Sequence, residues 1–145
     1  MKEKIQLDLT QGLKARQSVR VSTLRLLLSQ IQNEEISRRK PLSREEILAL
    51  IQRGIKTRRE SIQQFERGGR ADLVARESEE IAVLESYLPP QLSSEELTRS
   101  AEAIILELGA VGKKDMGQVM KALMERHAGQ VDGRRASSTV AFLLK

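Results

Sequence analysis

The sequence of 145 residues contains no cysteine and no tryptophan, and it has only three aromatic side chains. Without cysteine there can be no disulfide and no thiol nucleophile, which fits a reducing compartment. The three aromatic residues, Phe65, Tyr87 and Phe142, leave the core to Leu, Ile, Val and Met. Stacking of bases on exposed aromatic rings is therefore essentially unavailable, which argues against a sequence-specific reader of RNA.

Long apolar runs are also missing. No stretch approaches the length of a membrane-spanning helix, and the N-terminus lacks the apolar segment of a secretory signal peptide. The single histidine, His127, has no second His or Cys with which to form a metal site, and its charge would suit a helix C-terminus. These absences predict a cytoplasmic protein that contacts no membrane and binds no metal or cofactor.

Motifs for catalysis are equally scarce. The sequence pairs no nucleophile with an activating base, and it contains neither the Walker A nor the dinucleotide-binding glycine pattern. The acidic residues around Glu79 and Glu85 fit a solvated helix face, because general acid–base work needs a pocket that shifts their pKa values. The sequence therefore does not indicate an independent enzyme.

The charge balance is basic, with a formal net charge of +5. Residues 1–91 hold 17 basic and 13 acidic side chains, whereas residues 92–145 hold 8 and 7. The excess favours polyanionic partners. Charges of both signs are interleaved, however, and such interleaving is typical of solvated helix faces with i,i+4 pairs.

Apolar residues recur with helical spacing along the whole chain, and no stretch alternates as a strand does. The pattern predicts seven helices, at about residues 2–15, 19–37, 44–67, 70–88, 94–108, 115–126 and 134–145. Ser43 with Glu46, and Ser93 with Glu96, form capping boxes that place two of the helix starts. Ser18 is a reasonable N-cap for the second helix. The fold class is therefore all-α.

Pro89 and Pro90 stiffen a natural boundary, because each side of them has its own apolar stripes. We expect an N-terminal helical domain over residues 1–91 and a small three-helix domain over residues 92–145. Within the first, Gly68-Gly69 supplies the turn of a long antiparallel helical hairpin.

In each helix of this hairpin, charged residues stand where the apolar stripe should continue. Arg58 and Arg59 interrupt the third helix, and Glu77 interrupts the fourth. An antiparallel fold about Gly68-Gly69 brings residue 59 level with residue 78, at a common rise per residue. We predict an ion pair between Glu77 and Arg58 or Arg59. Its use would be to define the register rather than to add net stability, because desolvation offsets the attraction.

The stretch from Lys113 to Met124 carries an apolar stripe of helical spacing, preceded by Asp115 as a candidate N-cap. Lys113 and Lys114 stand at the positive end of this helix, and Gly117 lies in its first turn, where glycine costs about 1 kcal/mol against alanine. Two interpretations are open. Either the helix is a core helix whose N-terminal lysines are solvated, or its N-terminus is a phosphate-binding site. Candidate RNA-contacting residues in this part of the chain are Lys113, Lys114, Gly117, Lys121, Arg134 and Arg135.

The segment Asp115-Met116-Gly117-x-Val119-Met120-Lys121, followed by Gly129 and Asp132-Gly133, resembles the C-terminal signature of the YqeY-like family. That module is shared with the tail of the B subunit of the glutamine-dependent tRNA amidotransferases. The likeness extends over nearly the whole chain, through Phe65-x-x-Gly68-Gly69-Arg70-x-Asp72-Leu73, Glu77, Glu80-Ile81 and Tyr87-Leu88-Pro89-x-Gln91-Leu92-Ser93.

This resemblance implies an all-helical protein with an N-terminal helical region and a small C-terminal helical domain. In the amidotransferase the related tail is associated with holding tRNA, whereas the ammonia-transfer chemistry resides in domains that this chain lacks. Fold-level kinship does not transfer chemistry.

Three functions remain open. The first is a module that binds tRNA or similar structured RNA by backbone charge and shape, adding a grip on tRNA to a protein partner such as a tRNA-modifying or aminoacylation enzyme. The second is a protein-interaction module that docks through the N-terminal hairpin. A weaker third is an accessory role in glutamine-dependent amidation, a carbon–nitrogen ligase reaction. The sequence does not define the RNA, the partner or the oligomeric state.

Overall fold

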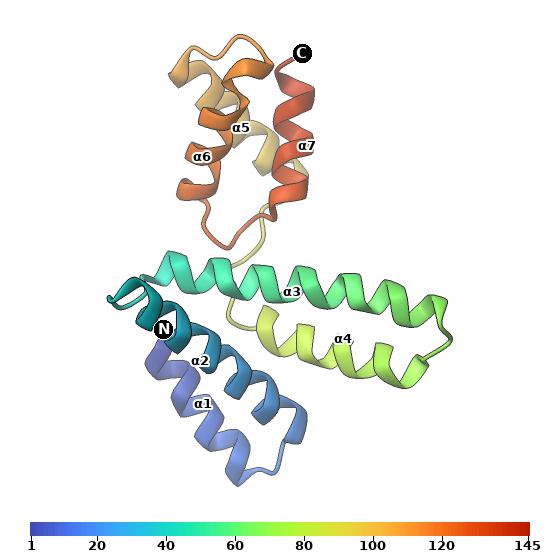
Figure 1. Ribbon diagram of the computed structural model, residues 1–145. Helices are drawn as coiled ribbons and strands as arrows, with labels where there is room; N and C mark the ends of the chain where they lie inside the picture. The colour runs from blue at the N-terminus through green and yellow to red at the C-terminus, as the bar shows by residue number, and fades with distance from the viewer. The chain divides into compact units, whose positions relative to one another are not determined.

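The computed structural model describes all 145 residues and contains helices and no strand, which confirms the all-α prediction (Figure 1). The chain divides into two compact units, Met1–Leu88 and Pro89–Lys145, each with its own apolar core. None of the helices combines the length and the apolar character that crossing a membrane requires.

The first unit consists of two helical hairpins (Figure 1). One pairs α1 (Lys2–Lys14) with α2 (Ser18–Arg38), and the longer one pairs α3 (Arg44–Arg67) with α4 (Ala71–Glu85). Helix α2 also packs against α3 and α4, which joins the two hairpins. The core contains aliphatic residues from all four helices, among them Ile5, Leu24, Ile31, Ile51, Ile55 and Leu84.

Local sequence accounts for most helix ends in this unit. The Ser43 hydroxyl accepts from the Glu46 amide at 3.1 Å, and the Glu46 carboxylate accepts from the Ser43 amide at 3.0 Å, which confirms this capping box. Gly69 adopts a φ of +70° in the turn between α3 and α4, a conformation that favours glycine. Ser18, by contrast, does not cap α2, because it is already the first helical residue and Gln17 stands at the cap.

Helix α4 ends at Glu85, three residues before the predicted end. The amides of Tyr87 and Leu88 bond to carbonyls three residues back, at 3.1 and 3.0 Å. These tighter turns end the helix before Pro89, since proline disfavours the α conformation in the residue that precedes it.

The second unit is a three-helix arrangement of α5 (Ser94–Leu108), α6 (Met116–Arg126) and α7 (Gly133–Leu143). A 3-10 turn, η1 (Lys113–Asp115), leads into α6. The capping box of Ser93 and Glu96 is present at the start of α5. Fully buried side chains from each helix form the core: Ala101, Ile104, Val119, Leu123, Ala136 and Val140.

The boundary between the units falls between Leu88 and Pro89, three residues before the predicted one. Residues 91 and 92 are hydrogen-bonded to the C-terminal unit: the Gln91 side-chain amide donates to the Gly129 carbonyl at 2.7 Å, and the Leu92 amide donates to the Gln130 carbonyl at 2.9 Å. The sequence shows where the prolines are, but these long-range hydrogen bonds determine to which unit residues 91 and 92 belong.

Candidate functional site

The start of α6 differs from the sequence prediction in how Asp115 is used. Asp115 stands at the N-cap position, but its side chain makes no bond to the helix. Its carboxylate instead accepts from the Val111 amide at 3.0 Å and closes the loop before η1. The prediction that Asp115 caps α6 is therefore wrong, and no side chain of the protein caps this helix.

Four of the six candidate RNA-contacting residues lie around this helix start. Lys113, Lys114, Gly117 and Lys121 are all exposed, and none of the three lysines has an acidic group within 4.0 Å. A side chain added at Gly117 would meet no atom within 4 Å, so packing within the protein does not require glycine there. Lys114, Gly117 and Lys121 recur every three or four residues and therefore share the solvent face. We call these four residues the α6 basic face.

Arg134 and Arg135 lie elsewhere. Helices α6 and α7 run antiparallel (Figure 1), so the start of α7 lies at the end of the unit opposite to Lys113. Eleven residues of α6 span about 16 Å. Moreover, the Arg135 guanidinium donates to the Leu92 carbonyl at 3.1 Å and serves to hold the segment before α5. The six predicted residues therefore do not form one cluster.

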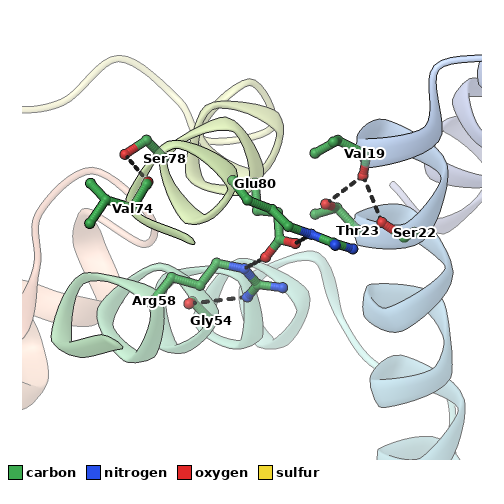
Figure 2. A network of polar contacts seen from close by, with 9 residues as sticks. Val19, Ser22, Thr23, Gly54, Arg58, Val74, Ser78 and Glu80 are labelled. Carbon is green, nitrogen blue, oxygen red and sulfur yellow. Dashed lines mark hydrogen bonds and ion pairs between the residues drawn. The ribbon is translucent and has the colours of Figure 1, made fainter. Parts of the chain in front are cut away.

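The long hairpin contains a cross-helix ion pair, but its carboxylate is Glu80 and not the predicted Glu77. Arg58 Nε lies 3.0 Å from Glu80 Oε2, and Arg58 Nη1 donates to the Gly54 carbonyl at 3.2 Å (Figure 2). Only 12% of the Arg58 side chain and 14% of the Glu80 side chain are exposed. Arg59 makes a second, exposed pair across the hairpin, with Glu85 at 3.2 Å.

The direction of the arginine side chain explains the difference. Helical side chains lean toward the N-terminus of their helix, and Arg58 extends back over Gly54 (Figure 2). In an antiparallel hairpin this moves the guanidinium toward the C-terminal part of α4, where Glu80 lies. Glu77 forms no ion pair, and its pKa is raised by burial and, next, by the charge of Glu80.

A groove of about 560 Å³ opens between α2, α3 and α4 next to this ion pair. It has apolar, amide, hydroxyl and charged side chains on its walls, including Leu26, Gln30, Asn33, Arg53, Thr57 and Glu77. Leu26 is about half exposed there. The groove belongs to the first unit, far along the chain from the α6 basic face.

A buried polar contact in the first unit was not predicted. The Tyr87 hydroxyl donates to Asp8 Oδ2 at 2.5 Å, and Lys4 Nζ lies 3.0 Å from the same oxygen. The bond from Tyr87 holds the pKa of Asp8 below its usual value, and burial, followed by the bond to Asp8, raises the pKa of Tyr87. The sequence feature that could have indicated this contact is the position of Asp8, three residues after the buried Ile5 on α1.

The His127 side chain does more than lie at a helix end, because both of its ring nitrogens form hydrogen bonds. Its Nε2 lies 2.5 Å from the Ser100 hydroxyl on α5, and its Nδ1 lies 3.2 Å from Gln130 Oε1. The Gln130 side-chain amide in turn donates to the Pro90 carbonyl at 3.2 Å. Nowhere in the protein do three His, Cys, Asp or Glu side chains gather in a way that could hold a metal ion.

Comparisons with known proteins match the chain over nearly its full length. A family model described as Yqey-like protein covers residues 2–144. The protein named "Altered inheritance of mitochondria protein 41, mitochondrial" from Eremothecium gossypii is 38% identical over 104 residues, which is 70% of this chain and 57% of that protein. Its namesake from Pyrenophora tritici-repentis is 31% identical over 144 residues, 94% of this chain and 77% of that protein.

A third protein of the same name, from Lachancea thermotolerans, is 35% identical over 70% of this chain and 56% of its own length. The chain therefore spans somewhat more than half of the first two yeast relatives. The printed names of all three relatives are those of mitochondrial proteins, so the prediction of a cytoplasmic protein is wrong on this finding. That prediction rested on the lack of an apolar secretory segment, whereas mitochondrial transit peptides are amphipathic and rich in arginine.

Proposed function

The chain belongs to the YqeY-like family, and from this premise we propose that it is a non-catalytic helical module that binds tRNA or a similar structured RNA. The binding surface is the α6 basic face. Phosphates supply most of the affinity of such binding, and their contacts carry little sequence information. The module thereby helps a partner enzyme to hold its RNA.

One observation supports this proposal above the others: the α6 basic face carries three exposed lysines with no acidic partner. Some exposed cations elsewhere do have a carboxylate beside them, as Arg126 has Glu107 at 3.2 Å. The uncapped start of α6 points its partial positive charge toward the same place. Asp115, the acid nearest to these lysines in the sequence, is engaged by the Val111 amide.

The test is binding of bulk tRNA to the whole protein at several salt concentrations, with a Lys113→Glu/Lys114→Glu variant. We expect wild-type affinity to fall steeply with salt, and the variant to bind at least about tenfold more weakly with a shallower slope. Each lost phosphate contact should reduce the slope of log K against log salt by about 0.7 to 0.9.

The matched control is Arg99→Glu/Arg134→Glu, which changes the net charge equally but at the opposite end of the unit. Both arginines are exposed, and neither forms an ion pair. This control is expected to bind much more tightly than the lysine variant. Equal losses in the two variants would show a general charge effect in place of a site, and no tRNA binding at low salt would overturn the proposal.

A second candidate function, docking of a protein partner on the first unit, is favoured by the groove between α2, α3 and α4. The half-exposed Leu26 gives it an apolar wall, and a partner segment would bury that side chain. A co-purifying partner that Leu26→Asp releases and Lys113→Glu/Lys114→Glu does not would support this function in place of RNA binding.

A further inference from the structure

Phe142 is an exposed aromatic ring, although the sequence led us to expect essentially no exposed ring on which a base could stack. It lies in the last turns of α7 with 67% of its surface exposed, whereas Tyr87 is buried. The Lys145 ammonium lies 4.6 Å from the centre of the Phe142 ring. An exposed Phe gains nothing from burial, so its place on the surface is not explained by the core of this unit.

The antiparallel packing of α7 against α6 places the end of α7, and with it Phe142, at the same end of this unit as the start of α6. Both helices contribute fully buried residues to one core: Val119 and Leu123 from α6, and Ala136 and Val140 from α7. Figure 1 shows the loop that leads into α6 and the end of α7 at the same end of the unit.

The neighbourhood of the ring is cationic. Lys113, Lys114 and Lys145 are exposed at this end of the unit and have no acidic partner within 4.0 Å. Gly117 has no side chain, and the space above it is empty of protein atoms. An exposed ring with one lysine against it, at the end of the unit that also carries Lys113, Lys114 and the open backbone at Gly117, suits a nucleotide, whose base stacks while its phosphate meets the cations.

We propose that Phe142 is a stacking platform for an unpaired base of the RNA whose phosphates the α6 basic face holds. This inference rests on the proposed function and narrows its ligand to RNA with a single-stranded end or loop next to a helical stem. Any base can stack, because each has a π face, so the contact selects unpaired nucleotides and not a sequence.

The experiment compares two RNAs of equal length, a blunt duplex and a hairpin with an unpaired 3′ end, on wild type and Phe142→Leu in the full chain. The leucine keeps an apolar side chain but removes the aromatic face. We expect about tenfold weaker binding of the hairpin, little change for the duplex, and an unchanged salt slope, because base stacking contributes affinity without neutralising a phosphate. Phe142→Tyr should restore the binding.

Two further variants separate the outcomes. Leu106→Ala removes another exposed apolar side chain of this unit and should bind both RNAs as wild type does. An equal loss in Leu106→Ala and Phe142→Leu would point to an apolar protein-docking surface and overturn the stacking role. If Phe142→Leu binds both RNAs as wild type does, while Lys113→Glu/Lys114→Glu does not bind them, this inference alone is overturned. Failure of the wild type to bind either RNA would overturn the proposed function, and this inference with it.

Discussion

Asp8 is a charged side chain that is buried in the first unit. It lies on the buried face of α1 with 6% of its surface exposed, beneath the ring end of Tyr87, which comes from the far end of the same unit. A buried carboxylate needs partners, and Tyr87, Lys4 and Arg20 supply them at 2.5, 3.0 and 3.7 Å. The contact joins the middle of α1 to the segment after α4.

Replacing Asp8 by Asn should lower the free energy of unfolding of the first unit by about 1–3 kcal/mol at pH 7, because an amide cannot replace charge-assisted bonds. The pKa of Asp8 is held low in the folded protein, so its contribution is complete above the unfolded pKa, about 4. It is lost as the pH falls through the lower folded value. Urea unfolding, followed by the fluorescence of Tyr87 at pH 7 and pH 3, should show the gap between variant and wild type narrowing.

Asp72→Asn is the control for this measurement. Asp72 is exposed and forms its ion pair only with Arg70, two residues away. Its replacement should change the unfolding free energy by no more than about 0.5 kcal/mol. Equal losses from the two substitutions would show that the Tyr87 contact contributes nothing particular.

At the scale of the helical elements, the long hairpin is joined by an ion pair one turn away from the predicted one. Arg58 bonds to Glu80 and to the Gly54 carbonyl (Figure 2), whereas Glu77 forms no ion pair. Gly54 matters here, since an added side chain would come within 3.2 Å of the Arg58 guanidinium. The pair therefore depends on a helix position that leaves room for the arginine to fold back.

Glu80→Gln should cost about 1–3 kcal/mol of unfolding free energy, because a mostly buried guanidinium would lose its carboxylate. Glu77→Gln should cost nothing, or stabilise by up to about 0.5 kcal/mol at pH 7. The raised pKa of Glu77 means that ionising it disfavours the folded state, so any gain should vanish below the pKa of an unfolded Glu, about 4.3. Thermal unfolding of the wild type and the two variants at pH 7 and pH 3.5 tests both predictions. A larger cost for Glu77→Gln than for Glu80→Gln would contradict this assignment.

At the scale of the whole molecule, the chain forms two units, each with its own core, and Pro89 begins the second. Leu92 is buried in the core of the second unit, and Gln91 and Leu92 bond to the loop before α7. The link to the first unit is therefore the peptide between Leu88 and Pro89, and not the longer segment that the prolines suggested.

A fragment of residues 89–145 should fold alone, with helical circular dichroism and a cooperative melt. A fragment of residues 93–145 should melt at a lower temperature, because it loses the burial of Leu92, about 1.5–3 kcal/mol, and the bond from its amide. Identical melts of the two fragments would show that residues 89–92 are not part of this unit.

Much of the fold could be predicted from the sequence, because the determinants lie close together along the chain. The apolar period placed all seven helices, and the capping boxes of Ser43 and Ser93 need only residues within one turn. The glycine turn at Gly69 is equally local. Four residues of the candidate site, Lys113, Lys114, Gly117 and Lys121, lie on the helix and the turn before it where the sequence placed them, and their role stays a prediction.

Tertiary structure decided what depends on distant residues. The antiparallel order of α6 and α7 separates Arg134 from Lys113, and it brings the end of α7, which carries Phe142, to the same end of the unit as the start of α6. Sequence spacing gives the height of a residue along its helix but not the direction of a long side chain. For that reason Arg58 meets Glu80, although spacing alone had pointed to Glu77.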